Sequence, residues 1–168
     1  MTPSEIDLVV AEALARLAHF SQKEQSTGDP YIRHVERVVA LSVVEIEKLT
    51  INLPTYPRID LRQRVQAVAW LHDVLEDSDI LVVDANEKLQ CMGFHPETVE
   101  PVLLLTRGWY TPYDAPYKEY INHLIGAKNL LALAVKIADL KDHLRPNCPA
   151  SLRPRYEAAL SLLTEVFS

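Results

Sequence analysis

Apolar residues recur at steps of three and four along most of the chain, which is the spacing of one buried face of an α-helix. Residues 5–21 show this period from Ile6 to Phe20, and a second run extends from Val35 to Leu49. The chain has four glycines and no Asn-Gly or Asp-Gly hairpin signal, and its long segments do not alternate as strands do. The pattern therefore predicts an all-α, multi-helix bundle.

Capping residues indicate where these helices begin. Asp29-Pro30 is expected to start the second helix, because Asp can cap free amides and Pro suits the first helical position. Asp60 is expected to cap one continuous helix over 61–77. The helices predicted in this way span 5–21, 30–49, 61–77, 84–92, 96–107, 116–126, 128–144 and 151–167.

The connections between the predicted helices carry breaking residues. Gly93 is expected to stop the helix near 84–92, and the segments 49–58 and 108–116 are rich in proline or aromatic residues. The segment SDILVV (78–83) is too short and isolated to require a sheet. Because the connections are mostly short and the composition does not shift, the sequence predicts one domain over 1–168.

Composition limits the classes of function. The chain has 168 residues, 48% of them apolar and 24% charged, as expected for a soluble globular domain with a real core. No apolar run approaches the roughly 20 residues of a membrane span, and the start MTPSEIDLVV lacks the basic region of a signal peptide. Two cysteines, Cys91 and Cys148, indicate a reducing cytoplasm and not a disulfide scaffold.

Charge limits the partners. The net charge of −6 argues against a duplex nucleic acid, because phosphate binding needs a basic surface. A polyanionic substrate would therefore need a local device, such as a metal ion or a few well-placed cations.

A polar cluster follows the apolar run AVAWL in the third predicted helix. On one continuous helix His72, Asp73, Glu76 and Asp77 would share one quadrant near the C-terminal end. Three acids there oppose the helix dipole and repel one another, and a cation would remove that penalty. Imidazole and carboxylate are ligands of Mn, Fe, Co and Zn. The plainer interpretation of an isolated His-Asp pair is a solvated helix end with a hydrogen-bonded histidine.

Two further polar positions favour the metal hypothesis. Asp139 directly follows the apolar run LLALAVKIA, with His143 one turn later, and His34 lies near the start of the second predicted helix. Each alone has a plainer interpretation, as a surface carboxylate or as a histidine bonded to a backbone carbonyl. Together, His34, His72, Asp73 and Asp139 form a set of two imidazoles and two carboxylates, which leaves coordination positions for water and substrate.

Five stretches of the chain resemble the HD superfamily of metal-dependent phosphohydrolases, in the order found in that family. More narrowly, they are similar to the hydrolase domain of the RelA/SpoT alarmone enzymes and to the small stand-alone alarmone hydrolases. The matching stretches are AHFSQ (18–22), GDPYIRHV (28–35), AWLHDVLEDS (69–78), VLLLTR (102–107) and VKIADLKDHL (135–144). The resemblance covers most of the chain and implies a bundle of the HD-domain type.

The resemblance also implies a site and a reaction. The implied metal ligands are His34, His72, Asp73 and Asp139. Manganese is the usual ion of the family, with Fe, Co or Zn as alternatives. Glu76 and Asp77 match the pair to which the family's acid–base role is assigned. In the family a metal-activated water attacks at the 3′ phosphate of ppGpp, which releases pyrophosphate and leaves GDP.

The positions that hold substrate in the family differ in this chain. In the alarmone hydrolases an Arg-Lys pair followed by Ser or Thr precedes the G-x-PYI motif, and the corresponding residues here are Gln25, Ser26 and Thr27. The family's Asn in ADL-x-DN is replaced by His143. The substrate contacts expected from the sequence are Thr27, Lys23, Arg107 and His143.

The sequence therefore predicts a metal-dependent phosphohydrolase that acts on a nucleotide-type phosphorylated small molecule. A (p)ppGpp 3′-pyrophosphohydrolase-like enzyme is the leading hypothesis. The alternatives are an HD phosphohydrolase acting on another nucleotide or sugar phosphate, and a metal-bound regulatory module without turnover. The Glu76-Asp77 pair argues against the last of these, because a pure binding module has no need of an acid–base pair.

Overall fold

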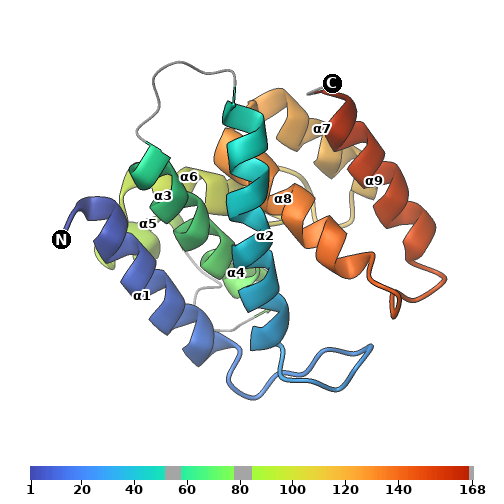
Figure 1. Cartoon of the computed structure of the whole chain (residues 1–168), viewed down its shortest axis with the longest axis horizontal. Helices are drawn as coiled ribbons and strands as arrows, with labels where there is room; N and C mark the ends of the chain where they lie inside the picture. The colour runs from blue at the N-terminus through green and yellow to red at the C-terminus, as the bar shows by residue number, and fades with distance from the viewer. Residues whose placement is uncertain (52–57, 78–84, 167–168) are drawn as a thin grey trace.

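The computed structural model describes residues 1–51, 58–77 and 85–166, and every regular element within these ranges is an α-helix. This confirms the predicted all-α class. The helices, shown in Figure 1, are α1 (Pro3–Ala18), α2 (Ile32–Thr50), α3 (Arg58–Leu71), α4 (Val74–Asp77), α5 (Ala85–Cys91), α6 (Pro96–Leu105), α7 (Tyr117–Ala127), α8 (Leu130–His143) and α9 (Arg153–Glu165). Within the described ranges, none of these helices combines the length and the apolar composition needed to cross a bilayer.

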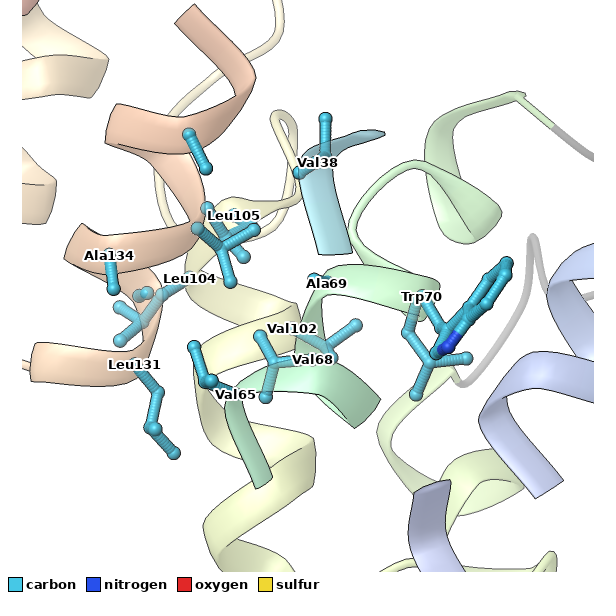
Figure 2. Packing of buried hydrophobic residues seen from close by; sticks show 14 of the residues in the cluster. Val38, Val65, Val68, Ala69, Trp70, Val102, Leu104, Leu105, Leu131 and Ala134 are labelled. Carbon is cyan, nitrogen blue, oxygen red and sulfur yellow. The ribbon is translucent and has the colours of Figure 1, made fainter. Parts of the chain in front are cut away.

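Helices α2, α3 and α8 form the centre of the bundle. In Figure 1, α2 runs between α3 and α8 and packs on both, while α1 covers α3 and α9 covers α8 on the outer flanks. Their shared core includes Val38 of α2, Val68 of α3, Val102 of α6 and Ala134 of α8, all fully buried and drawn in Figure 2. This core therefore fixes the relative positions of the helices that carry the candidate ligands.

Several predicted helix ends are confirmed. Gly93 follows α5 with φ 88°, a left-handed conformation that glycine adopts without steric cost. The predicted aromatic segment 108–116 lies in the non-helical connection between α6 and α7. Residues 52–57 of the predicted connection, all of 78–83, and the end positions 84 and 167 of two predicted helices lie outside the described residues.

The predicted start of α2 is wrong by two residues. Pro30 precedes the helix, because it pairs with Lys23 in an isolated bridge and the chain is still turning there. The Tyr31 amide donates to the Gln22 carbonyl at 2.9 Å, and the Glu24 amide donates to the Asp29 carbonyl at 2.8 Å. Residues 22–31 therefore form a closed loop, and α2 begins at Ile32.

The continuous helix predicted over 61–77 is also wrong, because the structure divides it. Helix α3 begins at Arg58, so Asp60 lies in its first turn and does not cap it, and α3 ends at Leu71. His72 and Asp73 occupy a turn before the short helix α4. The His72 ring donates from Nδ1 to the Ala69 carbonyl at 2.7 Å, which gives that carbonyl a side-chain partner at the helix end.

A buried carboxylate joins α1 to the start of α6, and its removal should destabilise the fold. Asp7 is 2% exposed and accepts hydrogen bonds from Thr98 Oγ1 at 2.5 Å and from the His95 amide at 3.2 Å. We expect Asp7→Ala to lower the free energy of unfolding by about 2 kcal/mol, because it leaves two donors without an acceptor. Urea unfolding measures the change. The matched control, Asp114→Ala at an exposed position, should stay within about 0.5 kcal/mol of wild type, and equal values for both variants would contradict the assignment.

Candidate metal centre

The structure brings the four predicted ligands together from three segments far apart in the sequence. His34 lies in the first turn of α2, His72 and Asp73 lie in the turn between α3 and α4, and Asp139 lies in α8. His72 Nε2 is 2.9 Å from Asp73 Oδ2 and 3.9 Å from Asp139 Oδ1. His34 Nε2 is 3.6 Å from Asp73 Oδ2 and 3.5 Å from Asp139 Oδ1. The predicted proximity of these side chains is therefore present.

Burial and missing hydrogen bonds show what the cluster can hold. His34, His72 and Asp139 are 2%, 4% and 3% exposed. Among the described residues, His34 Nε2, His72 Nε2 and Asp139 Oδ1 are buried and have no hydrogen-bond partner of good geometry. Buried polar atoms of this kind are costly unless something satisfies them. Ligand atoms of His34, His72 and Asp73 lie within 4.8 Å of one another, and two imidazole nitrogens with a carboxylate oxygen at such spacing fit one divalent cation of the Mn, Fe, Co or Zn type.

The electrostatics of the cluster favour positive charge. Burial lowers the pKa of His34, but its hydrogen bond to Asp142 and its interactions with Asp73 and Asp139 outweigh burial and raise the pKa to about 10. Burial alone would raise the pKa of Asp73, but nearby positive groups, above all His72, hold that pKa well below its usual value. Burial would also raise the pKa of Asp139, but nearby positive groups, above all Lys136, hold it well below its usual value. Both carboxylates therefore stay ionised and suited to a cation.

The two imidazoles are each held by a hydrogen bond at the nitrogen that faces away from the cluster. His34 Nδ1 donates to Asp142 Oδ2 at 2.8 Å, and His72 Nδ1 donates to the Ala69 carbonyl at 2.7 Å. Such bonds fix the ring orientation and the tautomer, and they leave Nε2 of each ring to bind an ion.

The two carboxylates are held in a similar way. Tyr31 Oη donates to Asp73 Oδ2 at 2.5 Å, and Lys136 Nζ donates to Asp139 Oδ2 at 2.7 Å. Because Lys136 binds Oδ2, Asp139 Oδ1 faces the imidazole nitrogens. Tyr31, Lys136 and Asp142 thus orient the candidate ligands, and sequence reasoning gave none of them this role. The one signal for Asp142 was its place one turn after Asp139 in a strongly apolar helix.

Asp142 also connects the site to a network of ion pairs beside it. Its Oδ1 accepts from Arg37 Nε at 2.6 Å, and Arg37 binds Glu24, which also pairs with Arg145 at 3.0 Å. Burial opposes ionisation of Asp142, but His34 and Arg37 outweigh it and lower the pKa to about 2. The network holds the loop before α2 against the end of α8.

We expect Asp142→Ala to weaken both the fold and the site. The variant leaves the buried ring of His34 without its acceptor and removes a carboxylate from Arg37. The free energy of unfolding should fall by about 2 kcal/mol, and metal affinity should fall about 10- to 100-fold. Urea unfolding and calorimetric metal titration measure the two changes, with the exposed Asp114→Ala as control. Unchanged metal affinity would show that Asp142 does not orient His34.

The predicted acid–base residues, Glu76 and Asp77, lie in α4, after the turn that holds His72 and Asp73. Because His72 and Asp73 occupy a turn, the predicted single quadrant of four side chains on one helix is wrong. The Glu76 carboxylate accepts a hydrogen bond from the Arg107 amide, so α4 is attached to the connection that follows α6. Asp77 ends α4, and its side chain lies outside the described part of the structure.

A cavity of about 490 Å³ opens beside the cluster, and His34, His143 and Tyr31 form part of its wall. Of the four predicted substrate contacts, Lys23 and His143 line this cavity. The other two, Thr27 and Arg107, are not among its described lining residues.

Arg107 and Thr27 instead stabilise loops. The Arg107 guanidinium donates from Nη2 to the Tyr113 carbonyl at 2.6 Å and to the Ala115 carbonyl at 3.3 Å. It also lies over the Tyr113 ring, 5.0 Å from its centroid. Thr27 is exposed, and its hydroxyl accepts from the Asp29 amide at 3.2 Å.

Comparison of the chain with protein-family models and with curated proteins finds no match.

Proposed function

We propose that this protein is a metal-dependent phosphohydrolase that cleaves a phosphoester of a nucleotide-type small molecule. One observation carries the proposal. His34, His72, Asp73 and Asp139 come from three distant segments and meet in one cluster, in which His34, His72 and Asp139 have buried, unsatisfied atoms and His34 lines a cavity. A plain helical bundle gains nothing from such a cluster, because burying these groups without partners is costly.

The four side chains would hold one divalent cation. The resemblance to the HD superfamily favours Mn²⁺, and the same donors accept Fe, Co or Zn. When bound, such an ion lowers the pKa of a water molecule and offsets negative charge on a phosphoryl group. Tyr31 and Lys136 would hold the two carboxylates in place, and Asp142 would orient the His34 ring, by the hydrogen bonds described above.

Glu76 and Lys23 are the proposed partners of the substrate. Glu76 matches the family's acid–base pair, and we assign it the transfer of a proton to or from the reacting groups. Lys23 is exposed at the cavity, where its ammonium group can pair with a phosphate. The cavity volume of about 490 Å³ falls within the range of small-molecule sites.

(p)ppGpp is the leading candidate substrate, on the strength of the resemblance. The charge of the cavity favours a second candidate, another nucleotide or a sugar phosphate with fewer phosphate groups. Lys23 is the one lysine or arginine among the described lining residues, and Gln25 and Ser26 are neutral. A substrate with two pyrophosphate groups would meet few cations there apart from the metal.

Pyrophosphate release tests the proposal directly. The purified protein is stripped of metal, reloaded with Mn²⁺ and incubated with ppGpp, and the release of pyrophosphate and GDP is measured. We expect turnover that depends on the metal. Turnover of a less phosphorylated nucleotide or sugar phosphate, and not of ppGpp, would select the second candidate. Hydrolysis of no phosphoester across a broad panel, with the metal fully loaded, would overturn the proposal in favour of a regulatory module.

We place this activity in the cytoplasm. Cys91 and Cys148 form no disulfide with each other. A reducing compartment keeps thiols in that state, and cytoplasmic proteins rarely depend on disulfides.

A further inference from the structure

We propose that His143 is a fifth protein ligand of the metal ion, so that the site contains three imidazoles and two carboxylates. The inference rests on the proposed metal centre and goes beyond the four ligands that the family resemblance implies. His143 stands where that family has an asparagine, and the sequence alone suggested a contact with substrate.

The position of the ring is the first support. His143 Nε2 lies 3.1 Å from Asp139 Oδ1. The same oxygen faces His34 Nε2 at 3.5 Å and His72 Nε2 at 3.9 Å. Ligand atoms of His34, Asp139 and His143 all lie within 4.8 Å of one another, as do those of His34, His72 and Asp73. His34 belongs to both groups, and Asp139 Oδ1 also faces His72 Nε2, so the two groups adjoin one another at His34.

The contact between His143 and Asp139 is not a good hydrogen bond. Asp139 Oδ1 has no hydrogen-bond partner of good geometry among the described residues, although His143 Nε2 is only 3.1 Å away. The other oxygen, Oδ2, is already held by Lys136. A nitrogen and an oxygen that lie close together without such a bond are placed as two ligands of a shared ion would be.

Neighbouring rings hold His143 in this position. Its ring stacks on Tyr156 of α9, with centroids 5.0 Å apart and an interplanar angle of 21°. It also lies near the ring of His34, with centroids 4.8 Å apart. His143 and Asp139 are one turn apart on α8, so both project from one face of the helix. Preorganised rings of this kind lose little conformational freedom when they bind an ion.

A third imidazole should change the choice of metal. Imidazole suits Zn, Fe, Co and Ni better than it suits Mn, which prefers carboxylate and water. His143 is also the most exposed member, since 38% of its side chain is accessible while Asp139 is 4% accessible. It would therefore form the rim of the centre on the cavity side and take a coordination position that would otherwise hold water.

Cobalt binding tests the inference without any measurement of activity. Metal-free wild type and His143→Asn are titrated with Co²⁺ and with Mn²⁺, and X-ray absorption of the Co²⁺ forms counts the imidazole ligands. We expect three imidazoles in wild type and two in the variant, and at least a tenfold loss of Co²⁺ affinity with a smaller loss for Mn²⁺. His95→Asn removes a histidine that belongs to neither group of candidate ligands and keeps a good helix cap, so it should change neither value.

The outcomes separate this inference from the proposed function. A wild-type count of two imidazoles would overturn the fifth ligand and leave the four-ligand centre intact. A wild-type protein that binds no divalent ion would overturn both. Because the wild-type imidazole count decides the question alone, poor folding of a variant would not prevent the test.

Discussion

Replacing Asp73 with alanine is expected to abolish both metal retention and hydrolysis. Asp73 Oδ2 lies 2.9 Å from His72 Nε2 and 3.6 Å from His34 Nε2, so the variant removes one of the two carboxylates that face both imidazoles. It also removes the acceptor of the Tyr31 hydroxyl. Metal affinity should fall at least about 100-fold, because loss of a ligand costs no less than loss of an orienting partner. Metal content per chain after gel filtration, and hydrolysis at saturating Mn²⁺, measure the two effects.

Thermal unfolding provides the control for this variant. A ligand that binds only the folded state stabilises it, by about 2.7 kcal/mol when its concentration is 100 times its dissociation constant. The melting temperature of wild type should therefore rise when Mn²⁺ is added, and that of Asp73→Ala should not. The exposed variant Asp114→Ala should respond as wild type does. Stoichiometric metal in purified Asp73→Ala would remove this residue from the ligand set.

The sequence predicted the helical class and several helix ends because these depend on local chemistry. The glycine at 93 acts within a few residues of its own position and follows α5 as predicted, and the helix predicted from residue 96 begins at Pro96. The break at His72 and Asp73 could not be predicted in this way, since helical periodicity continues through it to residue 77. It depends on a side chain that bonds to the Ala69 carbonyl.

The candidate site, too, was predicted in part: its ligands were visible in the sequence, and partners that orient them were not. The ligands were visible in the sequence because charged residues such as Asp139 interrupt strongly apolar helices. Tyr31 and Asp142 were not visible as orienting partners, because their bonds depend on which segments pack together. The hydrogen bond from His34 to Asp142 spans 108 positions and exists only where α2 packs on α8. The same packing places His143 beside His34, whereas the motif comparison alone assigned it to the substrate.

The charged residues around the cluster affect which substrate binds more than they affect the reaction at the metal. Arg37 and Arg145 lie close to the site, but both are occupied by Glu24 and Asp142. Their charges are therefore balanced within the protein, and Lys23 is the one lysine or arginine of the described cavity wall. A substrate with several phosphates would depend strongly on the metal for neutralisation. Metal identity and substrate preference should thus be coupled in this protein.

Glu76→Gln is expected to keep the metal and to lose most of the rate. The amide has nearly the same shape as the carboxylate, and its carbonyl oxygen can still accept the hydrogen bond from the Arg107 amide. It cannot take up and return a proton, so kcat should fall about 10²- to 10⁴-fold, the usual contribution of a general acid or base. The rate is measured at saturating substrate and metal, together with the metal content.

A pH profile makes this last test specific to proton transfer. If Glu76 moves a proton, one limb of the wild-type dependence of kcat on pH should disappear in Glu76→Gln, because the titrating group is gone. A merely structural role would lower the rate at every pH by a similar factor and would leave both limbs. Glu119→Gln, at an exposed position on α7, is the matched control and should keep the wild-type profile. Normal turnover by Glu76→Gln would contradict the acid–base assignment, and the proton would then have to move through another group.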